Sequence, residues 1–275
     1  MHNIDLNINP TLARKILTGF IRTEITRHGF QRAVLGVSGG IDSTLCLYLA
    51  AEALGPENVL ALRLPYKTSS KESLEHAQIA IDATGVPSKT IDITPMVEPL
   101  FEQFPDMDPL RRGNVMARQR MIIWYDQSEV FDALPLGTGN KTEILLGYST
   151  IYGDSAYALN PNGDLYKTQI RQLAAAMGVP QVIIDKPPSA DLWAGQTDEG
   201  ELGFTYEEVD KLLYLLVDRR YTAEECVAAG FKRPFVEGVI ERVRRNHFKR
   251  IMPPIAKVSN RTVGYDFLYL RDWGT

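Results

Sequence analysis

A short run of serine, glycine and aspartate is the part of this 275-residue chain whose residue types and spacing most clearly predict chemistry. The run, SGGIDS at 38–43, follows the apolar segment 33–37, which predicts a buried strand, and precedes a predicted helix over 44–52. A turn between a strand and a helix presents unpaired backbone N–H groups and the positive end of the helix dipole, and both favour an anion. Gly39 and Gly40 let the backbone approach a ligand closely. The run therefore predicts a phosphate-binding loop.

Asp42 is the unusual member of this loop, because a carboxylate repels phosphate. Its presence is explained if it holds a magnesium ion that bridges to the phosphates. The spacing differs from that of a Walker A loop and from the G-x-G-x-x-G dinucleotide fingerprint. The plainer alternative is a glycine-rich turn in which an Asp or Ser side chain caps the helix.

The loop resembles the pyrophosphate-binding loop of the N-type ATP pyrophosphatases, which cleave ATP to AMP and pyrophosphate while adenylating a substrate. The loop alone does not choose among the members of that class. A tRNA-modifying member and a module that senses ATP without turnover are the two rival hypotheses. The net charge of −4 and the two distant cysteines count against an RNA-binding extension or a zinc cluster, which the tRNA-modifying hypothesis requires.

Further motifs, from Ser38 to Pro254, resemble those of the ammonia-dependent NAD synthetase family in type and in order. They cover nearly the whole chain, which makes coincidence a poor explanation. They are RLPY at 63–66, GNVMARQRM at 113–121, GTGNKTE at 137–143, YGD at 152–154 and PPSADL at 187–192.

The resemblance implies that deamido-NAD is amidated by ammonia through an acyl adenylate, giving NAD, AMP and pyrophosphate. ATP is then a cosubstrate and Mg²⁺ the cofactor, with Asp42 and Glu143 as metal ligands. Asp42, Asp154 and Lys167 take the catalytic roles: Lys167 neutralises phosphate charge and Asp154 accepts a proton from ammonium. The implied ATP contacts are Ser38, Gly39, Gly40, Ile41, Asp42, Ser43, Thr44, Leu45, Arg63, Thr138, Lys167 and Ser189.

The same resemblance assigns deamido-NAD to Arg118, Asp154 and Lys249. Departures from one family form fall in this pocket, where Ile151 replaces a lysine and Ala158 an acidic residue. Phe248 stands where that form has a histidine next to the lysine. We therefore expect the dinucleotide pocket to have a different lining.

Each of these residues also has a plainer interpretation. Glu143 is also consistent with a solvated glutamate at a helix start, Asp154 with a turn aspartate, and Lys167 with a surface lysine. Arg118 belongs to a cluster of arginines, at 111, 112, 118 and 120, that is typical of a solvated helical face. The order of the surrounding motifs favours the functional interpretation.

The elements that position these residues alternate between strand and helix, which predicts an α/β fold with a doubly wound parallel sheet flanked by helices. The loops at Ser38, Leu64 and Gly137 then share the carboxyl edge of the sheet, where ligands bind. The resemblance implies an adenine nucleotide α-hydrolase-like fold. We expect one domain over 1–275: a helix at 11–27, a nucleotide-binding core at 31–185, a mobile lid at 186–204, and C-terminal helices with a tail at 205–275.

Composition predicts the setting and the partners. The chain lacks an apolar run of membrane-spanning length and a secretory signal, so we expect a cytoplasmic protein that binds neither membranes nor nucleic acid. Since the chain has no room for an amidase domain, ammonia would be free or come from a separate glutaminase subunit. The resemblance implies a homodimer, and the helices at 11–27 and 113–128, the latter with Trp124 and Tyr125, are the candidate interface.

Overall fold

The computed structural model describes residues 4–189 and 197–267, and its centre is a parallel sheet. The strands have the order β3-β2-β1-β4, and each neighbouring pair is parallel. Val34 of β1 lies opposite Leu60 of β2 and Pro135 of β4. The strands are β1 (Arg32–Gly36), β2 (Val59–Arg63), β3 (Ser88–Thr90) and β4 (Ala133–Pro135).

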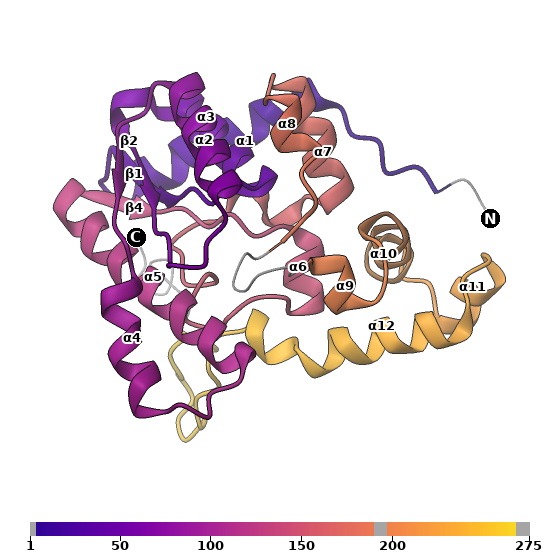
Figure 1. Ribbon diagram of the computed structural model, residues 1–275. Helices are drawn as coiled ribbons and strands as arrows, with labels where there is room; N and C mark the ends of the chain where they lie inside the picture. Colours follow the sequence, from indigo (N-terminus) through magenta and orange to yellow (C-terminus); the bar gives the residue numbers. More distant parts are fainter. Residues whose placement is uncertain (1–3, 190–196, 268–275) are drawn as a thin grey trace.

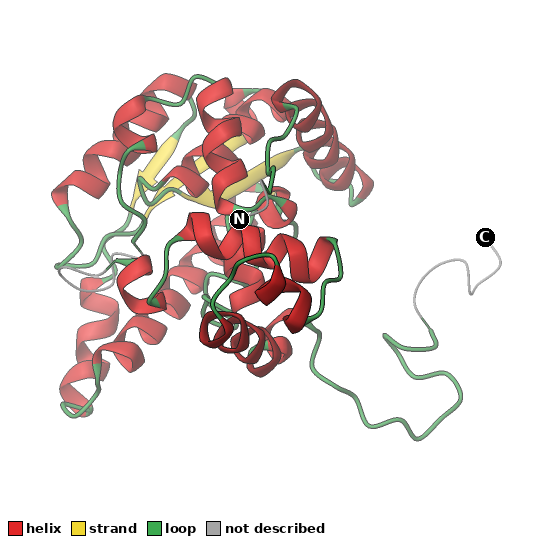
Figure 2. Ribbon diagram, turned by 90° about the vertical axis from the view of Figure 1, so that its right-hand side faces the viewer, coloured by secondary structure: helices red, strands yellow, loops and turns green. Residues whose placement is uncertain are grey.

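Helices cover both faces of this sheet, as Figure 2 shows, which confirms the doubly wound prediction. Side chains of β1 alternate between the two faces: Leu35 joins the core beneath one helical layer, and Val34 packs with Trp124 on the other side. A strand buried on both faces is apolar throughout, which explains the uninterrupted run at 33–37. The first layer contains α1 (Pro10–Arg27), α2 (Ile41–Leu54), α3 (Lys71–Thr84), α7 (Lys167–Ala176) and α8 (Gln181–Ile184). The second contains α5 (Pro109–Phe131), against which α4 (Thr94–Gln103) packs.

A second group of helices has its own apolar core and lies beside the sheet (Figure 1). Thr205 and Thr222 accept hydrogen bonds from backbone N–H groups in the first turns of α10 and α11, as a threonine three positions before a glutamate (TYEE at 205–208, TAEE at 222–225) predicts. Fully buried members of this core include Val209, Leu212 and Val236. The group contains α6 (Lys141–Leu146), α9 (Asp198–Leu202), α10 (Tyr206–Leu213), α11 (Ala223–Ala228) and α12 (Arg233–Arg245).

Several boundaries differ from the sequence-based expectations. The segment expected as a lid contains the helix α9, and its residues 190–196 lie outside the described part. The helix expected at 113–128 begins earlier, because Pro109 occupies its first turn, where a missing N–H costs nothing. The edge strand β3 is only three residues long and is exposed.

The two helices expected to form an interface are only partly exposed. In α1 the apolar positions divide into two stripes: Ile21 and Ile25 are buried, while Leu12 and Ile16 are 54% and 58% exposed. In α5 the expectation for Trp124 is wrong, because its ring is buried and its Nε1–H donates to the Val34 carbonyl at 2.9 Å.

The last described segment, 251–267, follows α12 and contains no helix. Figure 2 shows it running away from the rest of the molecule. Among the described residues, no helix combines the length and the apolar character needed to cross a membrane.

Candidate active site

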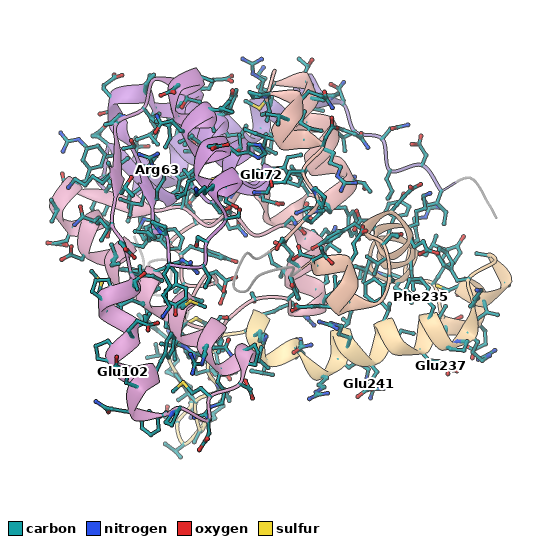
Figure 3. The ribbon with its side chains drawn as sticks, in the orientation of Figure 1. Arg63, Glu72, Glu102, Phe235, Glu237 and Glu241 are labelled. Atoms are coloured by element: carbon teal, nitrogen blue, oxygen red, sulfur yellow. The ribbon has the colours of Figure 1, made fainter. Side chains whose placement is uncertain are left out.

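A cavity of about 1580 Å³ opens at the carboxyl ends of the strands. Its walls include Ser38 after β1, Arg63 at the end of β2 and Thr138 after β4, which is the edge that the sequence predicts. The opposite wall comes from α12. In Figure 3, Arg63 lies on the sheet side and Phe235 on the α12 side.

The loop after β1 is held by its own serines. Ser43 Oγ donates to the Gly40 carbonyl at 3.0 Å and lies 3.1 Å from Ser38 Oγ. The cap residue of α2 is Gly40, which has no side chain to cap the helix, so the alternative of an Asp or Ser cap is wrong. The loop thus leaves Asp42, in the first turn of α2, to point at other partners.

Gly39 is required in this loop for two independent reasons. Its φ is +77°, a conformation that L side chains rarely adopt. A Cβ at this position would also lie 2.1 Å from the backbone oxygen of Ser73 in α3. The loop therefore packs against α3 at a distance that only glycine permits.

Lys167 is the centre of the buried charges in the cavity. Its side chain is 3% exposed, and its Nζ donates to Asp42 Oδ2 and lies 3.6 Å from Glu143 Oε1. Burial disfavours the ammonium, but the carboxylates of Asp42 and Glu143 outweigh this effect and raise the pKa of Lys167. The plainer interpretation of Lys167 as a surface lysine is wrong.

For Glu143, burial and a neighbouring carboxylate favour the neutral form of the side chain, whereas the charged form is favoured in Lys167. Burial and the neighbouring charge of Asp42 together raise the pKa of Glu143 to about 8, although Lys167 and the Asn140 N–H favour the ionised form. Its Oε2 accepts from the Asn140 N–H at 3.1 Å, which completes a capping box at the start of α6. At neutral pH the Glu143 carboxyl is therefore largely protonated when no further cation is close by, and the interpretation of Glu143 as a solvated glutamate is wrong.

Two buried asparagines that sequence reasoning missed fix Asp42. Asn140 Nδ2 donates to Asp42 Oδ1 at 2.8 Å, and Asn162 Nδ2 donates to the Asp42 carbonyl at 3.0 Å. An Asn three residues before Glu143 at a helix start is a capping signal that could have identified Asn140. Asn162 lies inside the short 3-10 helix Pro161–Asp164 and gives no comparable signal.

Asp154 and Lys249 line another part of the same cavity. Asp154 Oδ1 accepts from the Thr150 N–H at 2.7 Å, and the packed surroundings of this carboxyl raise its pKa even though the residue is open to the cavity. Lys249 Nζ donates to the carbonyls of Gly147 and Ser149 at 2.7 and 2.6 Å. Burial lowers the pKa of Lys249, against the opposing effect of Asp154.

The remaining predicted residues fall into two sets. Arg118 lies on the exposed side of α5, where its Nη2 donates to the Ile151 carbonyl at 3.2 Å, and Leu45 is buried in the core beneath the sheet. Arg120, two residues after Arg118, lines the cavity and was not singled out from the sequence. The predicted residues that line the cavity are Ser38, Gly40, Ile41, Asp42, Ser43, Arg63, Thr138, Glu143, Asp154, Lys167, Ser189 and Lys249, and those that do not are Gly39, Thr44, Leu45 and Arg118.

The described residues contain no group of three or more His, Cys, Asp or Glu side chains arranged to hold a metal. The pair Asp42 and Glu143 is nevertheless suited to Mg²⁺, which binds one or two carboxylates and takes its other ligands from phosphate and water.

Comparisons with known proteins agree with this geometry. The sequence model of the NAD synthase family matches residues 13–253. The NH(3)-dependent NAD(+) synthetase of Trichlorobacter lovleyi is 59% identical over 269 residues, 98% of each chain. Among solved structures, the NH3-dependent NAD synthetase of Campylobacter jejuni has a TM-score of 0.78 and 32% identity, covering 91% of this chain and all of that one.

A solved structure with a different substrate name is equally similar in fold. The NMN synthetase of Francisella tularensis has a TM-score of 0.80 and 29% identity, covering 91% of this chain and 99% of its own. With the family match and the 59% identical relative, the loop, the buried lysine and the two carboxylates lead to one conclusion: the chain belongs to the NAD synthase family and groups with its ammonia-dependent members.

Proposed function

We propose that this protein amidates deamido-NAD with ammonia, using ATP and releasing NAD, AMP and pyrophosphate. The observation that carries the proposal is the convergence of Asp42, Glu143 and Lys167 in the cavity that Asp154 also lines. The names of the relatives support the reaction. A cavity of about 1580 Å³ exceeds the roughly 300–1,000 Å³ of common small-molecule pockets, which supports the binding of two nucleotides.

In the first step of the proposal, the nicotinate carboxylate attacks the α-phosphorus of ATP and pyrophosphate leaves. The loop 38–43 and the first turn of α2 receive the pyrophosphate, because the helix N-terminus favours an anion. Lys167 neutralises charge that develops on the leaving phosphates. Thr138, Arg63 and Ser189 line the cavity and are the further ATP contacts of this proposal.

Asp42 and Glu143 would hold Mg²⁺ in this proposal. Their oxygens are the donors that this ion prefers, and the raised pKa of Glu143 indicates a local deficit of positive charge. When bound, the ion supplies charge neutralisation at the phosphates.

In the second step, ammonia attacks the acyl carbon, and AMP leaves. Asp154 would accept a proton from ammonium, and its raised pKa brings the carboxyl closer to the operating pH than an ordinary aspartate. Lys249 would contact deamido-NAD from the same side of the cavity.

Arg118 is exposed on α5, outside the cavity, and we propose that it contacts the dinucleotide bound by a second copy of the chain. We propose a homodimer that uses the exposed apolar residues of α1 and α5. These residues are Leu12 and Ile16 in one helical layer and Ile122 and Tyr125 in the other, and they are 42% to 58% exposed. The proposal also includes a single domain over 1–275 and a cytoplasmic location, and ammonia that is free or comes from a separate subunit.

The experiment supplies Mg-ATP, ammonium and either deamido-NAD or the matching mononucleotide, and quantifies the amidated product, AMP and pyrophosphate. We expect equal amounts of NAD, AMP and pyrophosphate with the dinucleotide, and none of them with Asp42→Ala. A preference for the mononucleotide would show that this protein amidates the mononucleotide, as the name of the Francisella enzyme indicates for that protein. Absence of ATP cleavage by the wild type with all substrates present would refute an enzyme of this class.

A further inference from the structure

A buried carboxylate outside the predicted site lies at the start of α9. Asp198 is 4% exposed, and its two oxygens accept from the hydroxyls of Tyr206 at 3.0 Å and Tyr148 at 3.1 Å. Burying a carboxylate is costly unless hydrogen bonds compensate it. The Tyr206 hydroxyl makes the shorter of these two bonds, and the Tyr148 hydroxyl is shared with Glu201, to whose Oε2 it donates at 2.6 Å. Asp198 also lines the cavity.

The two tyrosines connect Asp198 to both charged sides of the site. The Lys167 Nζ lies over the Tyr206 ring, 5.1 Å from its centroid, in a cation–π contact. The Tyr148 N–H donates to the Glu143 carbonyl at 2.9 Å, directly after α6. Asp198 therefore contacts the neighbours of Lys167 and Glu143.

The main chain of Asp198 makes a third connection. Its N–H donates to the Pro188 carbonyl at 3.0 Å, which fixes the residue immediately before Ser189. Asp198 thus links the ammonium of Lys167, the helix α6 that carries Glu143, and the backbone next to Ser189.

We propose that Asp198 is a positioning residue for ATP: through the hydroxyls of Tyr206 and Tyr148 it fixes Lys167 and Glu143 at the spacing that the magnesium–nucleotide requires. Asp198 acts through these tyrosines. This inference rests on the proposed function only in taking ATP as the ligand.

The test uses the full-length chain with Asp198→Ala, Asp198→Asn and Tyr206→Phe. Asp218→Asn is the matched control, because Asp218 accepts a tyrosine hydroxyl in the same way, from Tyr166, beside the other lysine pair of the molecule. Calorimetric titration with a magnesium complex of a non-hydrolysable ATP analogue measures binding without turnover. Steady-state kinetics give KM separately for ATP, the nicotinate substrate and ammonium.

Loss of a hydrogen bond to a charged group predicts about a tenfold weaker binding of the analogue, and a similar rise in the KM for ATP, in Asp198→Ala. We expect Tyr206→Phe to follow the same direction, and Asp198→Asn, whose amide can still pair with both hydroxyls, to stay close to wild type. The KM values for the other two substrates stay unchanged, and so does every parameter of Asp218→Asn.

Unchanged analogue binding in Asp198→Ala, an equal rise in all three KM values, or an Asn variant as weak as the Ala variant would each overturn the proposal. If Asp198→Ala does not fold, Tyr206→Phe and Asp198→Asn carry the same comparison. Analogue binding does not depend on which nicotinate compound is amidated, so failure of the proposed reaction is distinguishable from failure of this inference.

Discussion

Two lysines in this protein occupy the same local position in different surroundings. Lys141 is the first residue of α6 and Lys167 the first residue of α7, and each pairs with two carboxylates and lies over a tyrosine ring. The partners of Lys141 are Asp164 and Asp218, which are 94% and 33% exposed.

The partners of Lys167 are in contrast mostly shielded from water, and they line the cavity. Asp42 and Glu143 are 16% and 18% exposed, and the lysine itself is 3% exposed, against 15% for Lys141. Water screens the first pair, whereas the second pair interacts in a medium of lower dielectric constant. We therefore expect the same arrangement of residues to have a structural role where water reaches it and a chemical role where it lines the cavity.

The sharpest test of this difference replaces each lysine by methionine. We expect Lys167→Met to lower kcat/KM by about 10³-fold, because it removes a charge aimed at the transferring phosphates. It also leaves two buried carboxylates without their partner, at about 3–5 kcal/mol in unfolding free energy. Lys141→Met should leave the rate unchanged and cost about 1 kcal/mol or less. AMP formation measures the rate of each variant, and urea unfolding measures its stability. Equal losses of activity in the two variants would contradict the proposed difference between the two lysines.

The next test displaces the loop that carries Asp42. Gly39→Ala adds a clash with the Ser73 oxygen at 2.1 Å to a φ of +77°, whereas Gly29 has a φ of +82° and nothing within 4 Å. Gly29→Ala therefore measures the conformational penalty alone, about 1–2 kcal/mol, with unchanged activity. We expect Gly39→Ala to lose more stability and to raise the KM for ATP about tenfold. Identical behaviour of the two variants would show that the close approach to α3 is unimportant.

The pH dependence of stability tests the charge balance around Lys167. The pKa of Glu143 is raised from 4.5 to about 8, so the native protein binds more protons than the unfolded chain between these values. Glu143 therefore makes the protein less stable as pH rises through this range. We expect Glu143→Gln to remove that part of the pH dependence in thermal unfolding without magnesium. Parallel curves for the two proteins would contradict the raised pKa.

The smallest expected effects compare two capping boxes. Asn140→Ser keeps a good cap on α6 but loses the hydrogen bond of 2.8 Å to Asp42, so we expect nearly unchanged stability and about a tenfold loss of kcat/KM. Thr222→Ala removes the cap of α11, far along the chain, and should cost about 1 kcal/mol with full activity. Thermal unfolding and initial rates separate the two, and full activity of Asn140→Ser would mean that Asp42 needs no such support.

Much of the fold and part of the candidate site could be predicted from the sequence. The strand at 33–37, the loop at 38–43 and the caps at Thr205 and Thr222 depend on contiguous residues, and all are present. The burial of Trp124 could not be predicted, because helical periodicity identifies an apolar side chain but not the surface that covers it. Leu12 and Ile16 show that an apolar position in a helix need not be buried, since both remain exposed in the single chain.

The sequence by itself determined the local conformations, the family, and the fact that the loops after the parallel strands meet at one edge of the sheet. These features follow from short-range patterns and motifs. Only the tertiary structure decided which charges meet. Lys167 reaches Asp42 across 125 positions of the chain, and Asn140 reaches it across 98. Whether a buried charge is paired depends on how the helices pack together, and that packing brings Asp198, Tyr206 and Lys167 together at the wall of the cavity.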